Sequence, residues 1–481
     1  MTRCAGLLCA TLLCSLALGC AGSPLHPPPS GTVAALELEA FADFVLAVHP
    51  DAERFVSRAT FQAVVRGEAS RLRAQELPEE LDVGLAFQRV VAALHDSHMA
   101  VAQPAFQPGR DVSLLPLAVE LIADEVLVDA SVDDQPVGTT LEAIDGRDLA
   151  GILAALEPLA IYEGSNAAAR VRVLARDFVP LYHVAFGMRA SYALRLRLPD
   201  GSVSTVQVAG VERESFGALA RRRHSLAMRG RAADATDTLP SVYSVDALTQ
   251  VVRLPSFGNA DQEAVATRLS EVVALVAQTP QLVLDLRGNE GGYRTYGIAL
   301  LNHLSDRPYA QWRRTSVRVR SIPAVFRDRV EPLYGTSLAL LRAYPSHVVD
   351  GAHWLEGDPL ADRMLPAQPR LPADLVVFVD GLTNSAANEL LLALRVVRPD
   401  AVIVGEEVGG ECERHVGELP VAYVTPVYGV AVALSLIRIE HVTVPGCERG
   451  HGLRPDVPVV YTRDDFISGA DPYVRALGTI W

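Results

Sequence analysis

The sequence predicts a mixed α/β protein whose C-terminal half alternates strands with helices. Two short and almost wholly apolar runs, LVLDLRG at 282–288 and LVVFVDG at 375–381, each lead through a glycine-containing turn into an apolar helical pattern. Strands that alternate with helices form a mostly parallel sheet covered on both faces. A length of 481 residues, 49% of them hydrophobic and 21% charged, suits a globular protein of two or three domains.

The first twenty residues have the pattern of an export signal. Arg3 supplies a positive start, and the apolar run Ala5–Gly19 is too short for a transmembrane helix. The run ends at Cys20, which resembles the lipidated residue of a bacterial lipoprotein signal. We expect a lipoprotein signal, or alternatively a plain secretory signal, followed by a tether over residues 21–32. Membrane contact would then come only from the N-terminal lipid anchor.

Residues 33–105 are predicted to form an N-terminal helical domain, because their apolar residues recur at helical spacing. Residues 106–212 are predicted to be a β-rich module, with a hairpin turn at Asp200-Gly201. The run LEAIDGRDL at 141–149 resembles the closing strand of a PDZ module, without an evident carboxylate-binding loop. A degenerate PDZ-like module and a working peptide clamp both stay open.

The remaining chain divides into a polar segment over 213–245, which we expect to be a linker, and the alternating region 246–481. Four motifs follow one another in this last region: DLRGNEGG, TNSAANE, VGEEVGGE and HGLRPDVPV. Together they resemble the S41 peptidases, the family of carboxyl-terminal processing and tricorn-type serine proteases. The resemblance is strongest over Val251–Trp481 and traceable back to about Val33. It implies a ClpP/crotonase-like catalytic domain and a peptide or protein substrate.

Ser385 is the candidate nucleophile, because it opens an apolar helix directly after a buried strand and a polar turn. Unpaired N–H groups at a helix N-terminus favour negative charge, which an acyl-transfer enzyme needs for its oxyanion. A purely structural alternative is that Ser385 caps the helix, with Asn384 as a rival cap. By resemblance, the oxyanion donors would be the backbone N–H groups of Ala386 and Gly291.

The chain contains no lysine, so the serine–lysine pair of the processing proteases is excluded. The tricorn branch instead uses a serine–histidine pair on an N-terminal segment, which HDSHMAV matches with Ser97 and His98. We assign His98 as general base and Ser97 as its supporting hydroxyl, with His95 as the competing histidine. The resemblance places a late glutamate near Glu448, which would orient this pair or else be an ordinary exposed carboxylate. Another departure is Asn388 at the usual glutamate position, followed by Glu389.

Cysteine usage agrees with export, since four of the six cysteines lie in the leader and only Cys412 and Cys447 remain. An exported domain with two cysteines suggests one disulfide, with buried free thiols as the alternative. A zinc site is a poor third interpretation because neither cysteine belongs to a CxxC pair. We expect no metal and no cofactor. A net charge of −14 argues against nucleic-acid binding.

The leading functional prediction is an exported serine endopeptidase that works through an acyl-enzyme. A second prediction, from another class, is a catalytically weak protein that kept the fold and binds peptide or an apolar ligand. The displaced Glu448 and Glu389 motivate it. A serine esterase with the same residues is a third. The sequence does not indicate the oligomeric state.

Overall fold

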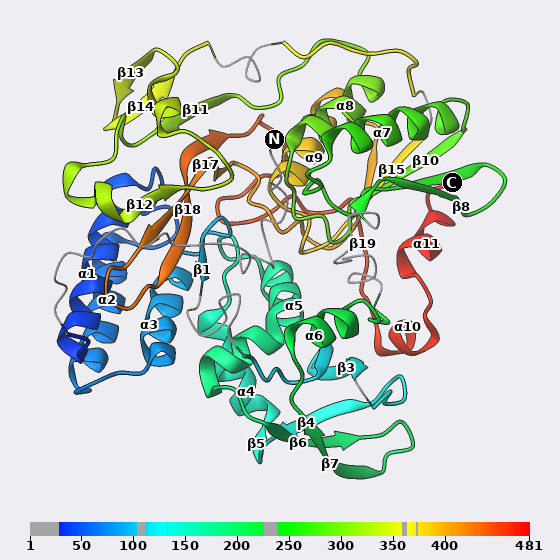
Figure 1. Ribbon diagram of the computed structural model, residues 1–481. Helices are drawn as coiled ribbons and strands as arrows, with labels where there is room; N and C mark the ends of the chain where they lie inside the picture. Colours follow the sequence, from blue (N-terminus) through cyan, green and yellow to red (C-terminus); the bar gives the residue numbers. More distant parts are fainter. Residues whose placement is uncertain (1–27, 103–110, 132, 226–237, 358–362, 372–373) are drawn as a thin grey trace.

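The computed structural model describes residues 28–102, 111–131, 133–225, 238–357, 363–371 and 374–481. Within these residues the strands form three sheets, each with its own set of helices (Figure 1). The predicted signal, the tether before residue 28 and Cys20 lie outside the described residues. No helix in the described part of the chain is long and apolar enough to cross a membrane.

The central sheet is parallel except for its edge strand β8, as the alternation of strands and helices predicts. In spatial order its strands are β19 (Val457–Pro458), β16 (Val402–Gly405), β15 (Asp374–Val379), β10 (Gln281–Asp285), β9 (Thr249–Arg253) and β8 (Ser241–Ser244). One face packs against α7 (Gln262–Val276), α8 (Arg294–Leu304) and α9 (Ala386–Val397). The opposite face packs against α11 (Pro472–Leu477). Both faces are therefore buried, which explains why the sequences of β10 and β15 are almost wholly apolar.

The carboxyl ends of β10 and β15 define where a site can form. These strands are neighbours in register, with Leu284 opposite Val377, so the turns that follow them lie side by side. Loops at the carboxyl ends of adjacent parallel strands are the usual place for a ligand site in such sheets. The two turns are 286–293, which leads into α8, and 380–385, which leads into α9.

A second, antiparallel sheet stands beside the first and carries the N-terminal helices. Its strands are β12 (Val330–Pro332), β17 (Arg414–Val424), β18 (Ala431–Glu440), β11 (Arg314–Val317), β14 (Ala352–Leu355) and β13 (Ser346–Val349), and β1 (Ala100–Ala102) also pairs with β18. Its helices are α1 (Gly31–Val48), α2 (Arg58–Arg73) and α3 (Glu80–Ala92), and two 3₁₀ turns, η4 (Ala324–Arg329) and η5 (Leu338–Arg342), lie in its connections.

The N-terminal helices have the predicted type, but they share one core with the C-terminal part of the chain. The Phe44 ring stacks on Tyr423 of β17 with centroids 4.8 Å apart, and Phe41 also packs on Tyr423. Pairing of β1 with β18, Ala100 opposite Ala433, then draws the chain after α3 across the sheet. This pairing carries the Ser97-His98 segment toward the central sheet, because it immediately precedes β1.

The third sheet is antiparallel and forms the module over 111–211 at the bottom of Figure 1. It contains β2 (Leu117–Ile122), β3 (Glu125–Ser131), β4 (Thr140–Ile144), β5 (Arg147–Asp148), β6 (Ser191–Arg197) and β7 (Val203–Ala209). Its helical parts are α4 (Leu149–Leu156), η2 (Glu157–Leu159) and α5 (Ala167–Phe186), and α6 (Arg213–Ala220) follows it. The short helix α10 (Arg463–Ser468), which precedes α11 near the end of the chain, also contacts this module.

A 20-residue helix within this module differs from the β-rich pattern that the sequence suggested. Its start is fixed by Asn166, whose side chain accepts a hydrogen bond from the N–H of Ala169. Val173, Phe178 and Tyr182 then bury one apolar face in the core of the module. Sheet and helix therefore share one core, and the strand signals on both sides of the helix hid its period of about 3.6 residues.

Candidate active site

Ser385 stands at the sharp turn between β15 and α9. Its backbone has φ 51° and ψ −126°, and its side chain makes no hydrogen bond that caps the helix. A non-glycine residue with positive φ is strained, and such strain concentrates where a turn must expose one side chain. The turn is braced by Asp380, whose Oδ1 accepts hydrogen bonds from the N–H groups of Leu382 and Thr383. Ser385 therefore occupies the N-cap position without using its hydroxyl as a cap.

The glycine turn after β10 lies directly against Ser385. A methyl group added to Gly291 would sit 2.7 Å from the Ala386 nitrogen and 2.7 Å from the Ser385 Cβ. Among the described residues, the N–H groups of Ala386 and Gly292 donate no hydrogen bond, whereas Gly291 N–H donates to Asn289 Oδ1 at 2.9 Å. Of the two oxyanion donors predicted from the sequence, the Ala386 N–H thus has no acceptor, whereas the Gly291 N–H is hydrogen-bonded to the side chain of Asn289.

Polar residues of DLRGNEGG brace this turn. Arg287 donates from Nε and Nη2 to both oxygens of Asp285, at 2.9 and 2.7 Å. Asn289 donates to the carbonyl of Leu254 at 2.8 Å and accepts from the N–H of Asn384 at its own carbonyl, at 3.0 Å. The last bond joins the glycine turn to the Ser385 turn and so fixes their separation.

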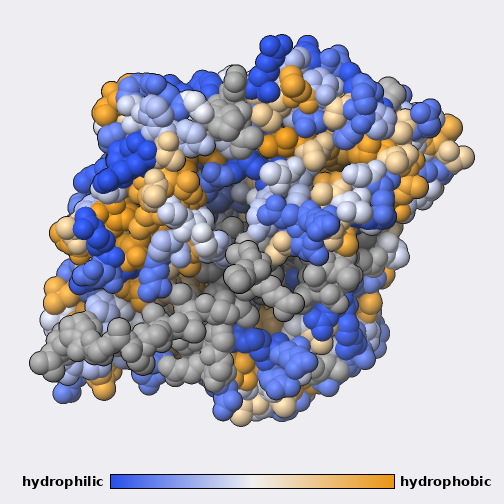
Figure 2. All heavy atoms as spheres, turned by 45° about the horizontal axis from the view of Figure 1, so that its top comes forward, coloured by the Kyte–Doolittle hydropathy of each residue, from blue (hydrophilic) through white to orange (hydrophobic). Residues whose placement is uncertain are grey.

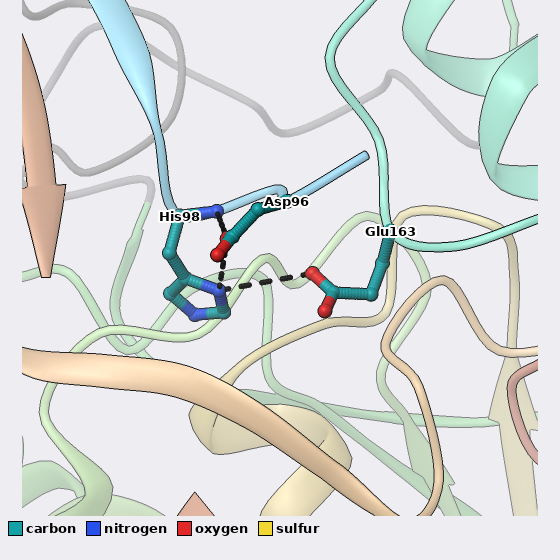
Figure 3. Close-up of side chains that lie close together, drawn as sticks. All are labelled: Asp96, His98 and Glu163. Carbon is teal, nitrogen blue, oxygen red and sulfur yellow. Dashed lines mark hydrogen bonds and ion pairs between the residues drawn. The ribbon is translucent and has the colours of Figure 1, made fainter. Parts of the chain in front are cut away.

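His98 reaches the same region from the loop between α3 and β1 (Figure 3). Its Nδ1 lies 3.3 Å from Ser97 Oγ, 3.8 Å from Asp96 Oδ1 and 3.9 Å from Glu163 Oε2. Its Nε2 is buried and has no hydrogen-bond partner among the described residues. Three oxygen atoms therefore lie within 3.9 Å of Nδ1, while Nε2 is left without a partner and could accept a proton from a hydroxyl. His95, the competing histidine, packs instead against the ring of Tyr162.

Ser97 links the histidine loop to the serine turn. Its hydroxyl donates to Glu163 Oε2 at 2.5 Å and accepts from Asn384 Nδ2 at 2.9 Å. Its N–H also donates to Glu163 Oε2, at 3.0 Å. Since Asn384 immediately precedes Ser385, this chain of bonds brings segments almost three hundred residues apart into one site.

Glu448 is not part of this group. It is exposed and forms an ion pair with Arg454 at 3.1 Å, so the displaced glutamate motif does not reach His98. The carboxylates beside Ser97 and His98 are Asp96 and Glu163, both buried. Sequence reasoning missed Glu163 because it lies in the loop before α5, in no motif. Asp96 stood inside HDSHMAV, two residues before His98, and its position was the available signal.

Burial governs the electrostatics of the site. It lowers the pKa of His98 to about 3, with a further lowering from His415 that the charges of Asp96 and Glu389 oppose. The pKa of Glu163 is raised well above its usual value by burial and by the nearby charge of Asp96. Burial also acts to raise the pKa of Asp96, but the hydrogen bond and charge of His49 outweigh it and lower that pKa. His98 is therefore neutral near pH 7, as a general base must be before it acts.

Asp96, His98 and Glu163 could together hold a metal ion, because one ligand atom of each lies within 4.8 Å of the others. Imidazole nitrogen and carboxylate oxygen are common ligands of zinc. However, the oxygen atoms concerned already accept hydrogen bonds from Ser97 and from the His98 N–H, the latter at 2.8 Å. The arrangement is therefore also suited to hold a protonated imidazole.

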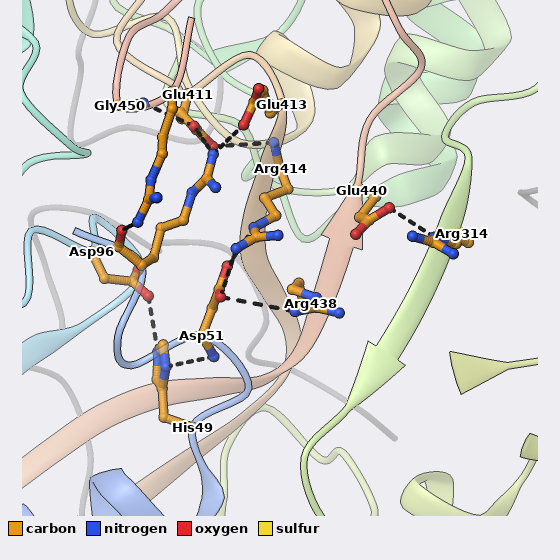
Figure 4. A network of polar contacts seen from close by, with 12 residues as sticks. His49, Asp51, Asp96, Arg314, Glu411, Glu413, Arg414, Arg438, Glu440 and Gly450 are labelled. Atoms are coloured by element: carbon orange, nitrogen blue, oxygen red, sulfur yellow. Dashed lines mark hydrogen bonds and ion pairs between the residues drawn. The ribbon is translucent and has the colours of Figure 1, made fainter. Parts of the chain in front are cut away.

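A network of ion pairs fastens the N-terminal segment to the second sheet, at the start of β17 and in the residues just before it (Figure 4). Arg54 pairs with Glu411 and with Glu413, and Asp51 pairs with Arg414 at 2.7 Å. His49 completes it by contacting Asp96 at 2.9 Å. Such a network fixes the loop that carries His98.

A disulfide joins Cys412 to Cys447, which are 35 positions apart. Of the alternatives given for these cysteines, the disulfide is the one that the structure contains. Cys412 directly follows Glu411, whose carboxylate contacts Arg54 and accepts from the N–H of Gly450. The cross-link therefore holds together two loops behind the site.

A face of the molecule near the second sheet is hollowed at its centre, and hydrophilic residues border much of the hollow (Figure 2).

Comparison with known proteins supports one family for the region that carries Ser385. Residues 249–439 match the family model described as Peptidase family S41, and no curated protein matches the chain. The structure is similar to that of mature CPAF, with a TM-score of 0.66 and 17% identity, over 93% of this chain and 96% of that one. Mature CPAF complexed with lactacystin gives a TM-score of 0.65 and 16% identity, over 94% and 97%. These likenesses show a shared fold across most of the chain.

Proposed function

Because this chain belongs to peptidase family S41 through residues 249–439, we propose that it is a serine endopeptidase with Ser385 as nucleophile and His98 as general base. The observation that carries the proposal is the Ser385 hydroxyl, which occupies a helix N-terminus on a strained turn without capping it. His98 supports it by presenting a buried Nε2 that has no partner in the described residues. A base and a nucleophile that both lack structural partners are what acyl transfer requires.

The protonation states follow from the contacts of His98. Oxygen atoms surround its Nδ1, so in the neutral ring we assign the proton to that nitrogen. The lone pair of Nε2 is then free to take the proton of the Ser385 hydroxyl as the hydroxyl attacks the scissile carbonyl. Asp96, whose pKa is lowered, lies 3.8 Å from Nδ1 and stabilises the imidazolium that results, and Glu163 lies 3.9 Å from the same nitrogen. Glu163 takes the role for which the sequence had suggested Glu448.

The oxyanion that forms in this step lies at the N-terminus of α9. Ala386 N–H is one donor, and the 291–292 turn that abuts Ser385 supplies the second. Either Gly291 N–H exchanges Asn289 for the oxyanion, or Gly292 N–H donates. Collapse of the intermediate breaks the peptide bond, and His98 returns the proton to the leaving amine. Water then hydrolyses the acyl-enzyme with His98 again as base.

Finer features of the proposal rest on the resemblance of the sequence motifs. The absence of lysine and the Ser97-His98 pair favour the tricorn-like serine–histidine branch of the family. We further propose a ClpP/crotonase-like catalytic domain, a degenerate PDZ-like role for the sheet over 111–211, and export through the Cys20 signal. Within this proposal the departure at Glu389 does not count against activity, because Glu389 is buried and pairs with Arg294 at 3.0 Å.

A panel of peptides and esters, tested on the leaderless protein and on Ser385→Ala, tests the proposal. We expect wild type to cleave at least one peptide internally and Ser385→Ala to lose that cleavage by about 10³-fold or more. Since a structure of mature CPAF is complexed with lactacystin, we also propose lactacystin as a competing probe. Cleavage of esters alone would replace the peptidase by an esterase. Peptide cleavage that persists in Ser385→Ala would refute the assignment.

A further inference from the structure

Arg294 joins the two helices whose N-termini border the proposed oxyanion position. It is the first residue of α8, two positions after Gly292, and Glu389 lies in the first turn of α9. The Nε and Nη2 groups of Arg294 donate to the two carboxylate oxygens of Glu389, each at 3.0 Å. Two parallel bonds between planar groups fix both a distance and an orientation. The pair therefore sets the position of one helix start relative to the other.

This bridge between Arg294 and Glu389 is shielded from water. The Arg294 side chain is 13% exposed and that of Glu389 is fully buried. The guanidinium group also lies over the ring of Trp312, 4.6 Å from its centroid. Burial acts to raise the pKa of Glu389, but the charge of Arg294 is the largest of the effects that lower it well below its usual value. The bridge is therefore a charge-assisted pair in an environment of low dielectric constant, where such bonds are strong.

A third contact of Arg294 comes from the second sheet. The pairing of β17 with β18 shifts its register between Gly417 and Pro420, which is a β-bulge. Within it, Glu418 and Leu419 have φ values of 59° and 46°. A bulge changes the direction in which side chains point. Leu419 enters the core shared with the N-terminal helices, and Glu418 forms an ion pair with Arg294. Arg294 thus links α8, α9 and β17.

The packing of α8 against α9 shows what the bridge controls. A methyl group added to Gly297 would lie only 3.2 Å from Leu390 Cβ, so the two helices are in close contact there. Arg294 and Glu389 each lie on the N-terminal side of that contact, toward the site. The N–H of Glu389 also donates to the carbonyl of Ser385 at 2.9 Å. Loss of the bridge would therefore let the two helix starts move apart at the site.

We propose that Arg294 is a positioning residue for the reaction: by binding Glu389 it holds the proposed oxyanion donors, Ala386 and the 291–292 turn, at the separation that the transition state requires. This inference rests on the proposed serine–histidine chemistry. It also assigns a role to Glu389, the residue by which the sequence departs from the family motif.

Four variants separate the geometry of the bridge from its charge. Arg294→Lys keeps a positive charge, but a single ammonium group cannot make the two parallel bonds of a guanidinium. Arg294→Gln and Glu389→Gln each remove one partner, and the double variant removes both. The measured quantities are the maximal rate at which a fluorophosphonate labels Ser385 and the reagent concentration that gives half of this rate.

We expect the maximal labelling rate to fall by about 10²-fold in Arg294→Gln and in Glu389→Gln, since a misplacement of about 1 Å has an effect of this size. Arg294→Lys should lose about tenfold, because its charge remains without the paired bonds. The half-saturating concentration should change by less than about threefold, since the donors act on charge that develops only in the transition state. The double variant should be about as slow as each single variant, because the two partners form one interaction.

Arg223→Gln is the matched control. Arg223, which follows α6, pairs with Asp129 of β3 at 2.7 Å, and their side chains are 9% and 0% exposed. Its replacement likewise leaves a buried carboxylate without its arginine, but far along the chain from the Ser385 turn. We expect Arg223→Gln to lose thermal stability, as Arg294→Gln does, and to keep the wild-type labelling rate.

The outcomes distinguish this inference from the proposed function. If wild type labels and a folded Arg294→Lys or Glu389→Gln protein labels at the wild-type rate, the inference fails and the serine–histidine assignment stands. Single-variant losses that multiply in the double variant would also overturn the inference, because the two residues would then act separately. If wild type does not label, the proposed function fails and the inference with it. Should Arg294→Gln not fold, Arg294→Lys and Glu389→Gln provide the same test.

Discussion

Replacing Gly291 by alanine tests the glycine turn as part of the catalytic machinery. Gly291 has φ +91°, and an added Cβ would lie 2.7 Å from the Ala386 nitrogen and from the Ser385 Cβ. Ordinary contact begins near 3.4 Å, and the Ala386 nitrogen is a backbone atom that cannot rotate away. The turn and the start of α9 must therefore separate, and with them the two proposed oxyanion donors.

The expected effect of Gly291→Ala has two parts, a loss of folding free energy and a loss of kcat. An alanine at this φ costs about 1–2 kcal/mol of folding free energy, whatever its surroundings. Displacing one oxyanion donor lowers kcat by about 10²–10³-fold. Because donors act on the developing charge rather than on the bound substrate, KM should change much less than kcat.

The assay compares kcat and KM for a cleaved peptide, together with thermal unfolding, in Gly291→Ala and in Gly201→Ala. Gly201 is the matched control because it has φ +85° and open space around its Cβ position. We expect both variants to lose similar stability and only Gly291→Ala to lose kcat. Wild-type kcat in a folded Gly291→Ala protein would refute the placement of the oxyanion at this turn.

Two further predictions concern stability. Burial lowers the pKa of His183 to about 4 in the folded protein. Between pH 6.5 and pH 4 the unfolded chain therefore binds a proton at His183 that the folded protein does not bind. The stability that neutral His183 contributes above pH 6.5 is lost over this range. The free energy of unfolding, measured in urea, should therefore fall by about 3 kcal/mol less between pH 6.5 and pH 4 in His183→Gln than in wild type. An unchanged pH dependence would contradict this prediction. Breaking the Cys412–Cys447 disulfide with paired serines should lower the unfolding free energy by about 4 kcal/mol, given the 35-residue separation, and an unchanged urea midpoint would contradict it.

The parts of the fold that the sequence predicted are those set by local pattern. Apolar runs followed by glycine turns indicated β10 and β15 with their helices, and Ser385 was placed at a helix N-terminus from the same signal. The parallel sheet followed because such runs must be buried on both faces. The helix α5 was missed, since strands on both sides of it gave the whole module a β-rich pattern.

The candidate site was predictable only where one segment supplied both the residue and its neighbours. Ser97 and His98 stood in one short motif, and in the structure Ser97 accepts a hydrogen bond from Asn384, the residue before Ser385. Glu163 and His415 come from segments without any motif, and their contacts with the pair exist only through tertiary packing. Glu448 was proposed from its resemblance to the family motif, which says nothing of the direction in which an exposed side chain points.

The network around Arg54 gives the site a dependence on the N-terminal segment. The proposed general base, His98, is carried by a loop that belongs to neither strand nor helix, so its position depends on β1 and on the ion pairs of Asp51 and Arg54. A proteolytic cut or a substitution that frees this segment would withdraw His98 while leaving the Ser385 turn intact. Such a protein would keep its nucleophile but lose its base.

The most direct test of the central claim is site-mapped labelling of the leaderless protein by a fluorophosphonate, in wild type and in His98→Ala. The account predicts one labelled peptide, modified at Ser385, and a labelling rate that falls by about 10²-fold or more without His98. Labelling at another serine, or labelling of Ser385 at an equal rate in His98→Ala, would contradict the claim that these two residues form the catalytic pair.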